Sequence, residues 1–320
     1  MRKLPVPLPP LNEQKRIVTK IEALQTRSTA VKEELEAIKP LLNQFRQSVL
    51  ASAFRGDLTK DWREHNKHTP WEHTTLKSVI KDRPRNGYSP KAVDYPTEVK
   101  SFSLSATTSG IFKPEYFKYL DKKIEQDSHL WLKPGDVLIQ RSNTLEYVGT
   151  SAIYTGQFGD FVYPDTVMKV QVNEDKTTNK FIYYSLSNKK TRQYFKANAT
   201  GTAGNMPKIN QKTVMNTPVS LPSTEEQEEI VRRIESLFKL ADSIEQQYQQ
   251  AEVDLEILNQ SILAKAFRGE LVPQDPNDEP ASVLLERIRK EREETAAKKS
   301  KTKKKRSNKK QDKQLGIPGL

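Results

Sequence analysis

The chain has 320 residues, a formal net charge of +12 and no cysteine. This length allows one or two folded domains, and the absence of cysteine excludes a disulfide framework, a cysteine-ligated metal site and a thiol nucleophile. The proline-broken first residues do not resemble a signal peptide, and no apolar run approaches the length of a membrane span. We therefore expect a cytoplasmic protein of bacterial or archaeal type that does not enter a membrane.

The first predicted element is a long helix, and its sequence occurs twice in the chain. Residues 8–58 return as residues 221–271 without a gap, and 19 of the 51 positions are identical. Two structural helices with no further role would also account for a run of regularly spaced apolar residues. The gap-free duplication around an intervening domain favours a defined, paired architecture instead.

Inside each copy, apolar residues follow alternating steps of four and three. A repeat of 3.5 residues held over about five heptads is typical of a left-handed coiled-coil seam. Pro40 predicts a kink or a restart in the first helix. The apolar positions of the first copy are Ile17, Ile21, Leu24, Val31, Leu35, Ile38, Leu42, Phe45 and Val49.

Residues 59–218 are predicted to form an α+β domain between the two helices. Strands are expected at residues 135–139, 148–154 and 166–172, where β-branched residues are bounded by turn residues. A helix is expected at residues 178–197. Polar loops rich in Gly, Pro, Ser, Thr and Asn are expected at residues 83–90, 105–110 and 199–207.

The charge is distributed unevenly along the chain. The middle domain has 24 basic and 16 acidic residues, so it is basic without help from the tail. Residues 1–58 carry 10 basic and 6 acidic residues, whereas residues 219–286 carry 5 and 15. These opposite charges favour pairing of the two helices. Antiparallel pairing would place two of their ends beside the domain that joins them.

The predicted organisation therefore has five parts. A first helical repeat (1–58) and the α+β domain (59–218) are followed by a second helical repeat (219–272) and a short helix or linker (273–297). Residues 298–320 are rich in lysine and are expected to be disordered. This tail is either a solvated extension or a non-specific contact to DNA phosphates.

No catalytic motif is found. The chain has neither of the two common glycine-rich phosphate-binding loops. Residues 205–208 (NMPK) lack the second proline and the aromatic residue of an adenine methyltransferase motif, and Asp94, Glu98 and Lys100 imitate a nuclease cluster in a highly charged sequence. His65, His68 and His73 lie on a polar linker and are expected to be solvated rather than metal-bound. The sequence indicates a binding protein and not an enzyme.

Five sequence motifs carry a resemblance to the specificity subunit of type I restriction–modification systems. The resemblance covers residues 1 to about 290. Over this range the chain is similar to the C-terminal half of such a subunit, with one target-recognition domain flanked by both conserved helices. Residues 2–7 resemble the final strand of a preceding domain. The motifs are PLPPLNEQKRIV (7–18), PVSLPSTEEQEEIV (218–231), AFRGDL (53–58), AFRGEL (266–271) and LKPGDVLIQRS (132–142).

The resemblance implies the architecture and the role of the chain. The two helices would form an antiparallel coiled-coil spacer, and the α+β domain would recognise one half-site of a bipartite double-stranded DNA target. Separate modification (methyltransferase) and restriction subunits would dock on the chain and use S-adenosylmethionine, ATP and Mg²⁺, so this chain itself would need no cofactor. Two copies could dimerise and read a symmetric target. A coiled-coil adaptor that binds no DNA, and a specificity module separated from a fused restriction enzyme, remain alternatives.

Two sets of candidate residues follow. Arginine suits guanine, asparagine and glutamine suit adenine, and lysine mainly contacts phosphate. The candidate DNA-binding residues are Arg83, Arg85, Asn86, Tyr88, Gln140, Arg141, Ser142, Asn143, Thr144, Thr202, Asn205 and Lys208. The candidate subunit-interface residues are Ile17, Ile21, Leu24, Leu42, Phe54, Arg55, Ile230, Ile234, Leu237, Leu255, Phe267 and Arg268.

Overall fold

The computed structural model describes residues 7–66, 70–201 and 206–311, with residues 297–311 described by their backbone alone. The chain divides into two compact units. Met1–Lys39 and Gln246–Leu320 form one, called here the helical unit, and Pro40–Glu245 form the other, called the mixed unit. Within the described residues, no helix combines the length and the apolar character needed to cross a bilayer.

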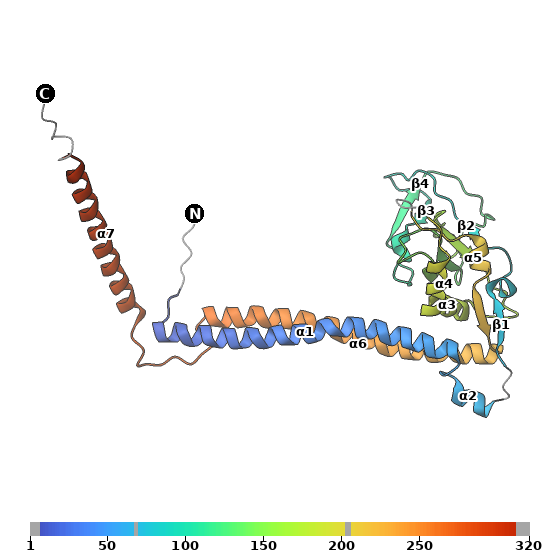
Figure 1. Cartoon of the computed structure of the whole chain (residues 1–320), viewed down its shortest axis with the longest axis horizontal. Helices are drawn as coiled ribbons and strands as arrows, with labels where there is room; N and C mark the ends of the chain where they lie inside the picture. The colour runs from blue at the N-terminus through green and yellow to red at the C-terminus, as the bar shows by residue number, and fades with distance from the viewer. Residues whose placement is uncertain (1–6, 67–69, 202–205, 312–320) are drawn as a thin grey trace, which may run out of the picture. The chain divides into compact units, whose positions relative to one another are not determined.

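The elements follow in chain order (Figure 1). They are α1 (Leu11–Arg55), α2 (Lys60–His65), β1 (Glu72–Thr75), η1 (Leu76–Val79), β2 (Arg85–Asn86), β3 (Val99–Phe102), η2 (Leu104–Ala106), β4 (Phe117–Leu120), β5 (Val137–Gln140), β6 (Ser151–Ile153), β7 (Val167–Val170), α3 (Asn179–Ser187), α4 (Lys189–Ala197), α5 (Gln211–Met215), β8 (Pro218–Leu221), α6 (Thr224–Phe267) and α7 (Ala281–Gln311).

The mixed unit is built around a four-stranded antiparallel sheet. Its strand order is β2-β7-β5-β6, and Leu138 on β5 lies opposite Ala152 on β6 and Lys169 on β7. Two further strand pairs, β1 with β8 and β3 with β4, are also antiparallel. The three predicted strands are confirmed as β5, β6 and β7.

Strand β5 is buried on both faces, which explains its continuous apolar sequence. Successive side chains of a strand point to opposite faces. Val137 and Ile139 enter the larger core, which also contains Phe181 and Ile182 of α3. Leu138 points into a second cluster with Tyr154 and other aromatic residues. Two cores therefore lie on the two faces of one sheet.

Within the mixed unit, the end of α1 and the start of α6 run alongside each other in opposite directions. Arg46 donates to Asp242 and Glu245, each at 2.7 Å, and Arg233 on α6 donates to the carbonyl of Leu58 just beyond α1 at 2.8 Å. Residues from both helices, including Leu50, enter the larger core. The globular part is thus packed on a helix pair of its own unit.

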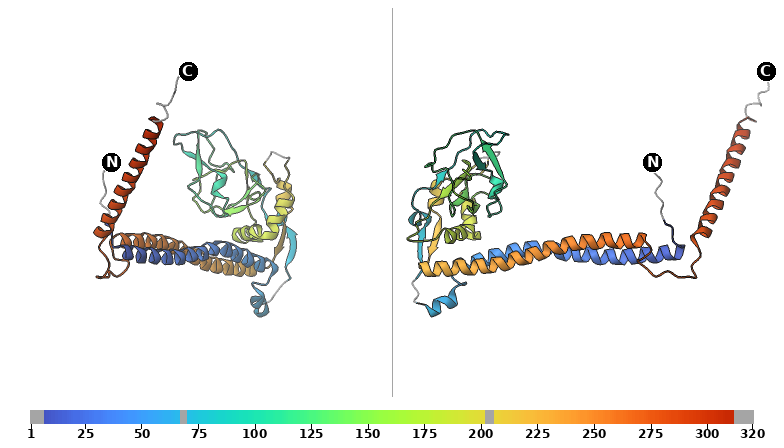
Figure 2. Two further views of the ribbon diagram at one scale, coloured as in Figure 1. Left: turned by 60° about the vertical axis from the view of Figure 1, so that its left-hand side comes forward. Right: turned by 180° about the vertical axis from the view of Figure 1, so that it is seen from behind.

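In the helical unit, the first part of α1 and the last part of α6 also lie side by side, as both views of Figure 2 show. Arg16 of α1 pairs with Asp278, which follows α6, at 2.7 Å. Ile17, Ile21 and Leu24 are half-buried along this pair. The predicted fold class, an α+β domain with two long helices in an antiparallel coiled coil, is confirmed.

Four expectations need correction. Helix α1 continues through Pro40, so the predicted restart is wrong, while a kink stays a prediction. The helix predicted at residues 178–197 is two helices, because Asn188 has an extended backbone and caps α4 by accepting from the Thr191 amide. Helix α7 continues through residues 298–311 of the lysine-rich tail predicted to be disordered, since lysine, arginine and alanine favour helix and no Gly or Pro interrupts it, while residues 312–320 of that tail lie outside the described residues. Part of the first polar loop is strand β2.

Candidate nucleic-acid interface

Four segments far apart in the sequence meet at one end of the four-stranded sheet. The loop after β2 donates from the Tyr88 amide to the Tyr163 carbonyl at 2.9 Å. The loop after β5 donates from the Arg141 amide to the Thr166 carbonyl at 2.8 Å. The Ile209 amide belongs to residues 206–210, called here the exit segment, and donates to the Arg141 carbonyl at 2.9 Å. The loops after β2 and β5 are therefore joined through residues 163–166, and the segment around Ile209 is joined to them through Arg141.

Gly87 lets the loop after β2 lie close against the backbone of Tyr163 and Pro164. A Cβ atom placed on Gly87 would lie 2.1 Å from the Tyr163 carbonyl oxygen, so only glycine fits here. Beside it, the Ser89 hydroxyl donates to the Asp165 carboxylate at 2.7 Å and accepts from the Asp165 amide at 3.0 Å. The first loop is thereby fixed on the turn that carries Asp165.

Residues 163–166 are the part of this site that the sequence did not predict. The segment reads Tyr-Pro-Asp-Thr, and proline followed by aspartate is a turn signal. A turn signal alone does not indicate which loops the turn will contact. Its role comes from strand pairing, which places β7 between β2 and β5.

Gln140 is not available to read DNA, which corrects its assignment. Its side chain is fully buried, and its amide nitrogen donates to the Leu104 carbonyl at 3.0 Å and to the Thr107 hydroxyl at 2.9 Å. Its amide oxygen accepts from Asn143 at 2.7 Å. As the last residue of β5, Gln140 holds two loops together and lies beneath the surface.

Ser142 needs the same correction. It is buried, its amide donates to the Thr166 carbonyl at 3.1 Å, and it forms a bridge with Lys208 of the exit segment. The alternation of side chains along this short extended segment explains why Ser142 points inward. Its neighbour Arg141 is half-buried with its guanidinium at 3.3 Å from the Asp165 carbonyl.

The remaining candidates on these loops reach the surface to different degrees. Tyr88, Thr144 and Lys208 are exposed, and Asn143 is half-buried. The half-buried Asn86 has a buried amide oxygen that accepts no hydrogen bond from the described part of the chain. Arg83 and Arg85 are exposed and line a separate hollow beside β2. Thr202 and Asn205 lie outside the described residues.

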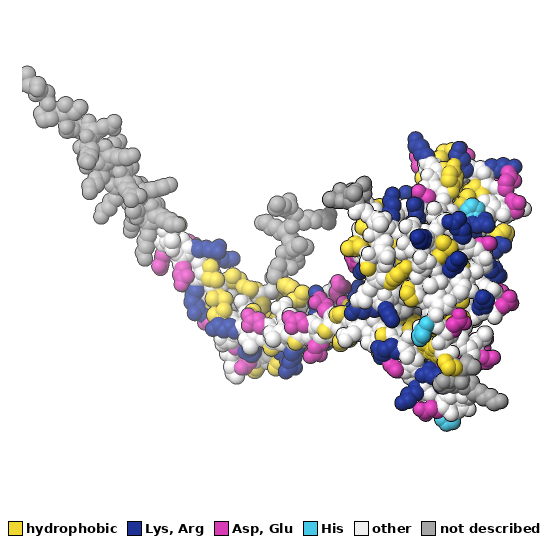
Figure 3. All heavy atoms as spheres, turned by 45° about the vertical axis from the view of Figure 1, so that its right-hand side comes forward, with side chains coloured by type: hydrophobic (Ala, Val, Ile, Leu, Met, Phe, Trp, Pro, Cys, Tyr) yellow, Lys and Arg dark blue, Asp and Glu magenta, His cyan; other side chains and the backbone are white. Residues whose placement is uncertain are grey.

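Lysine and arginine side chains are spread over the globular part of the surface in Figure 3. Few of them are neutralised: among the described residues of the middle domain, ion pairs involve Arg63, Lys81, Lys123, Lys169 and Lys180. Arg141 and Lys208 belong to those that no carboxylate pairs within the described residues. A surface of this kind attracts a polyanion.

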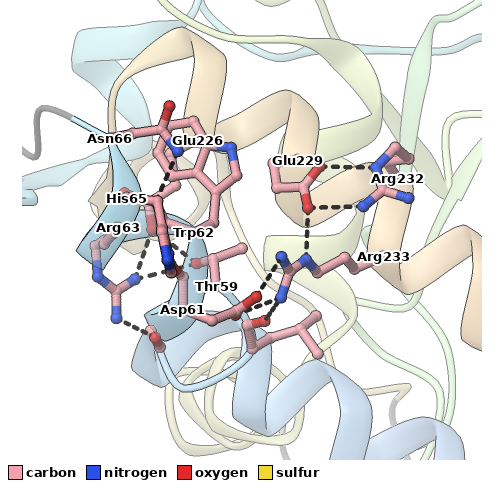
Figure 4. A network of polar contacts seen from close by, with 12 residues as sticks. Thr59, Asp61, Trp62, Arg63, His65, Asn66, Glu226, Glu229, Arg232 and Arg233 are labelled. Carbon is pink, nitrogen blue, oxygen red and sulfur yellow. Dashed lines mark hydrogen bonds and ion pairs between the residues drawn. The ribbon is translucent and has the colours of Figure 1, made fainter.

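The globular part is fixed on α6 by the buried carboxylate of Glu226 (Figure 4). This carboxylate accepts from Thr59 at 2.7 Å, from Arg63 at 2.5 Å and from the Trp71 indole at 3.0 Å. The next residue, Gln227, accepts from Thr177 at 2.8 Å. The Glu-Gln pair of the repeat motif thus connects the helix start to the domain.

Charged contacts around the same helix start shift two pKa values. Hydrogen bonds from Arg232 and Arg233 lower the pKa of Glu229 to about 2. A hydrogen bond from Arg233 lowers the pKa of Asp61 to about 2. Figure 4 shows Arg233 between these two carboxylates. These groups stabilise the attachment of α2 to α6 and are not arranged for proton transfer.

Ile17, Ile21 and Leu24 are half-buried in the helical unit, and the other candidate interface residues fall into three groups. Leu42, Ile230 and Ile234 are buried within the mixed unit, and their assignment to a subunit interface stays a prediction. Phe54 and Leu237 pack against the larger core, and Leu255 is half-buried in the helical unit. Arg55, Phe267 and Arg268 are exposed at the two repeat endings.

The histidine cluster is not a metal site within the described residues. His65 lies 2.7 Å from the Asp61 carbonyl and His73 lies 3.1 Å from the Ser220 hydroxyl. His68 lies outside the described residues. No group of three potential ligands occurs in the part of the chain that the structure describes.

Comparison with known proteins gives matches within one family. A family model described as "Type I restriction modification DNA specificity domain" matches residues 69–253. The chain is 33% identical over 306 residues to the EcoKI specificity subunit of Escherichia coli, covering 92% of this chain and 65% of that protein. It is 32% identical over 328 residues to the EcoDI specificity subunit of Escherichia coli, covering 92% of this chain and 70% of the relative.

Solved structures show the same fold. The HsdS subunit of Thermoanaerobacter tengcongensis superposes with a TM-score of 0.51 at 22% identity, covering 83% of this chain and 60% of that one. A chain from a study of type I R-M complex assembly gives 0.63 at 22% identity, with 83% and 62% covered. The chain thus spans less than two thirds of the EcoKI subunit and of both solved chains. It belongs to the family of type I restriction modification DNA specificity domains.

Proposed function

We propose that the chain is the DNA-binding specificity subunit of a type I restriction–modification complex and that it recognises one half-site of a bipartite target. One observation carries this proposal. Loops that are separate in the sequence are hydrogen-bonded to one another around residues 163–166 and present Arg141, Thr144 and Lys208 on one basic domain.

The residue types suit a division of roles at this surface. Arg141 is the candidate for a bidentate contact with guanine, and Tyr88 and Thr144 are candidates for base-edge or methyl contacts. Lys208 is suited to a phosphate contact. Because the loops are hydrogen-bonded together, the side chains are held in a fixed relation before DNA binds, which lowers the entropic cost of recognition.

The chain is not an enzyme; its family is one of specificity domains. Methylation and cleavage would belong to modification and restriction subunits that use S-adenosylmethionine, ATP and Mg²⁺. A cleft of about 490 Å³ beside the first repeat ending offers one docking surface, with Phe54, Arg55 and Lys190 in its lining. Both repeat endings carry an exposed arginine, Arg55 or Arg268, that could meet an acidic partner surface.

A homodimer is the second part of the proposal, and the internal repeat supports it. The helical unit has an apolar groove of about 1030 Å³ lined by residues of both repeats. In it Val18 is 52% exposed and Leu263 is 44% exposed, whereas their repeat equivalents in the mixed unit, Val231 and Leu50, are 8% and 2% exposed. A second copy that covers this groove would bury apolar surface of the kind the mixed unit buries itself.

The proposed function is tested first by DNA affinity as a function of salt. Methylation mapping of the host genome supplies the target, and binding is then compared on the target and on a scrambled duplex. A specificity subunit requires tighter binding to the target and a linear fall of log affinity with log salt. A chain that binds neither duplex would instead be a coiled-coil adaptor.

The dimer is tested separately by light scattering at micromolar concentration. The expected result is a dimer that dissociates when Val18 and Leu263 are both replaced by glutamate. Wild-type protein that remains strictly monomeric would refute this part of the proposal and leave DNA recognition by a single chain unaffected.

A further inference from the structure

A hollow beside β2 is lined by more basic side chains than acidic ones. It has a volume of about 200 Å³ and lies within the mixed unit, apart from the loops joined at residues 163–166. Four basic side chains line it: Arg83, Arg85, Lys133 and Lys169. The lining also contains His129, Trp131 and Phe158 and two carboxylates, those of Asp82 and Asp127.

Two of the cations face each other across the sheet. Arg85 on β2 and Lys169 on β7 are direct cross-strand partners, so their side chains lie on the same face. Like charges directly opposite each other destabilise a strand pair. This pairing therefore destabilises the sheet. A ligand of opposite charge would reduce the repulsion between Arg85 and Lys169.

Lys169 is held in place and cannot turn away from the hollow. It is 5% exposed, and its ammonium donates to the Trp131 carbonyl at 2.9 Å and lies 3.3 Å from the Asp136 carboxylate. The same oxygen of Asp136 also accepts from the Lys133 amide at 2.9 Å. Asp136 is thus shared between two partners.

The electrostatics of Lys169 agree with this geometry. Burial lowers the pKa of its ammonium and Asp136 opposes that effect, while the charges of Lys133 and Arg85 lower the pKa further. An anion in the hollow would raise the pKa of Lys169, as the carboxylate of Asp136 does. The pKa of Lys169 is therefore expected to rise when an anion occupies the hollow.

The size of the hollow limits the ligand. Pockets for nucleosides and other drug-sized ligands span roughly 300–1,000 Å³, so this hollow is too small for a flipped base or a nucleotide. A single phosphate group fits the volume and the donor set. Guanidinium groups offer paired donors to phosphate oxygens, and lysine contributes a compact charge.

We propose that this hollow holds one phosphate of the DNA backbone, with Arg83, Arg85 and Lys133 as its exposed ligands and Lys169 as the fixed cation between them. This inference rests on the proposed DNA-binding function and changes the role of Arg83 and Arg85, which the sequence alone suggests as base-reading residues. The strand that carries Arg85 continues into Gly87 and Tyr88 at the reading loops. A phosphate held here would position the duplex for reading there.

The test compares charge-removing variants on two duplexes. Arg85→Gln and Lys133→Gln are each measured on the mapped target and on a duplex of arbitrary sequence over a series of salt concentrations. Lys60→Gln, an exposed lysine on α2 outside the hollow, is the matched control. Melting temperatures confirm that the variants are folded.

A phosphate contact predicts a specific pattern of results. Each pocket variant should weaken binding to both duplexes by the same factor, roughly fivefold or more, because a charged hydrogen bond is lost. Each should also reduce the slope of log affinity against log salt by about 0.9. The Lys60→Gln control should change both quantities much less.

Other outcomes separate the possible failures. Loss on the target alone would make these residues base readers, and effects no larger than the control would show that the hollow binds no phosphate; either result overturns the inference. If wild-type protein binds no duplex, the proposed function fails, and titration with inorganic phosphate decides about the site. NMR detection of the Lys169 ammonium should then show its pKa rising with phosphate, and an unchanged pKa would refute the site.

Discussion

Phe54 and Phe267 occupy equivalent positions in the two helical repeats but have opposite environments. The Phe54 ring packs on Phe181 with ring centroids 5.5 Å apart, whereas Phe267 is 68% exposed. The same local sequence, Ala-Phe-Arg-Gly, surrounds both residues. The difference therefore comes from what covers each repeat ending and not from the helix itself.

This difference predicts unequal effects of truncation. Phe54→Ala should lower the free energy of unfolding by about 2–3 kcal/mol, somewhat less than a fully buried phenylalanine, because the side chain is half-buried. Phe267→Ala should change it by no more than about 0.5 kcal/mol. Chemical denaturation of the two variants measures both effects. Equal destabilisation would contradict the assignment of Phe54 to the core.

Glu226 should be among the most sensitive positions for stability. Removing this buried carboxylate by Glu226→Ala leaves the Arg63 guanidinium without its partner and costs about 3–5 kcal/mol of unfolding free energy. The nearby Glu228 is exposed on the same helix, so Glu228→Ala serves as the control and should change stability by about 0.5 kcal/mol or less. If Glu226→Ala behaved like its control, the network in Figure 4 would not anchor the domain.

Stability should decrease in acid, and the direction follows from two lowered pKa values. Glu229 and Asp61 have pKa values of about 2, below their ordinary values of 4.5 and 3.8. Their contribution is complete above those ordinary values and is lost as the pH falls toward 2. Urea titrations from neutral pH downward should show this decline.

Two variations of the acid experiment identify its source. Glu229→Gln should flatten the decline, because the substituted side chain no longer titrates. High salt should also weaken it, because exposed ion pairs such as that of Asp61 are screened. An identical pH profile in wild type and variant would assign the acid sensitivity to other groups.

Arg141 is the sharpest test of base recognition. Arg141→Ala should weaken binding to the mapped target by about 1–3 kcal/mol and weaken binding to a scrambled duplex much less. The matched control is Lys208→Ala, which should reduce affinity for both duplexes alike if it contacts phosphate. Equal losses on both duplexes for Arg141→Ala would reassign this arginine to the DNA backbone.

Gln140 should affect stability instead of direct recognition. Gln140→Ala leaves the partners of a buried amide unsatisfied and should cost about 1–3 kcal/mol of unfolding free energy. Gln193→Ala removes an exposed glutamine from α4 and should be nearly neutral. A Gln140 variant with unchanged stability but lower affinity for the target alone would restore its original assignment as a base reader.

The sequence determined the large-scale organisation of this protein. The duplication of residues 8–58 as 221–271, the 3.5-residue spacing and the opposite charges of the two segments predicted two paired antiparallel helices around an α+β domain. These signals are local or repeat along the chain, so they are readable without coordinates. The Gly-Asp strand motif likewise predicted β5, because its apolar run is buried on both faces of the sheet.

The tertiary structure alone decided which polar residues reach the surface. Gln140, Arg141 and Ser142 are adjacent in a polar stretch, yet Gln140 and Ser142 are buried whereas Arg141 is only half-buried. Residues 163–166 became central, and Arg83 and Arg85 joined Lys169, only because β7 lies between β2 and β5. Accessibility depends on contacts between segments far apart in the sequence. Residue type and spacing do not encode it.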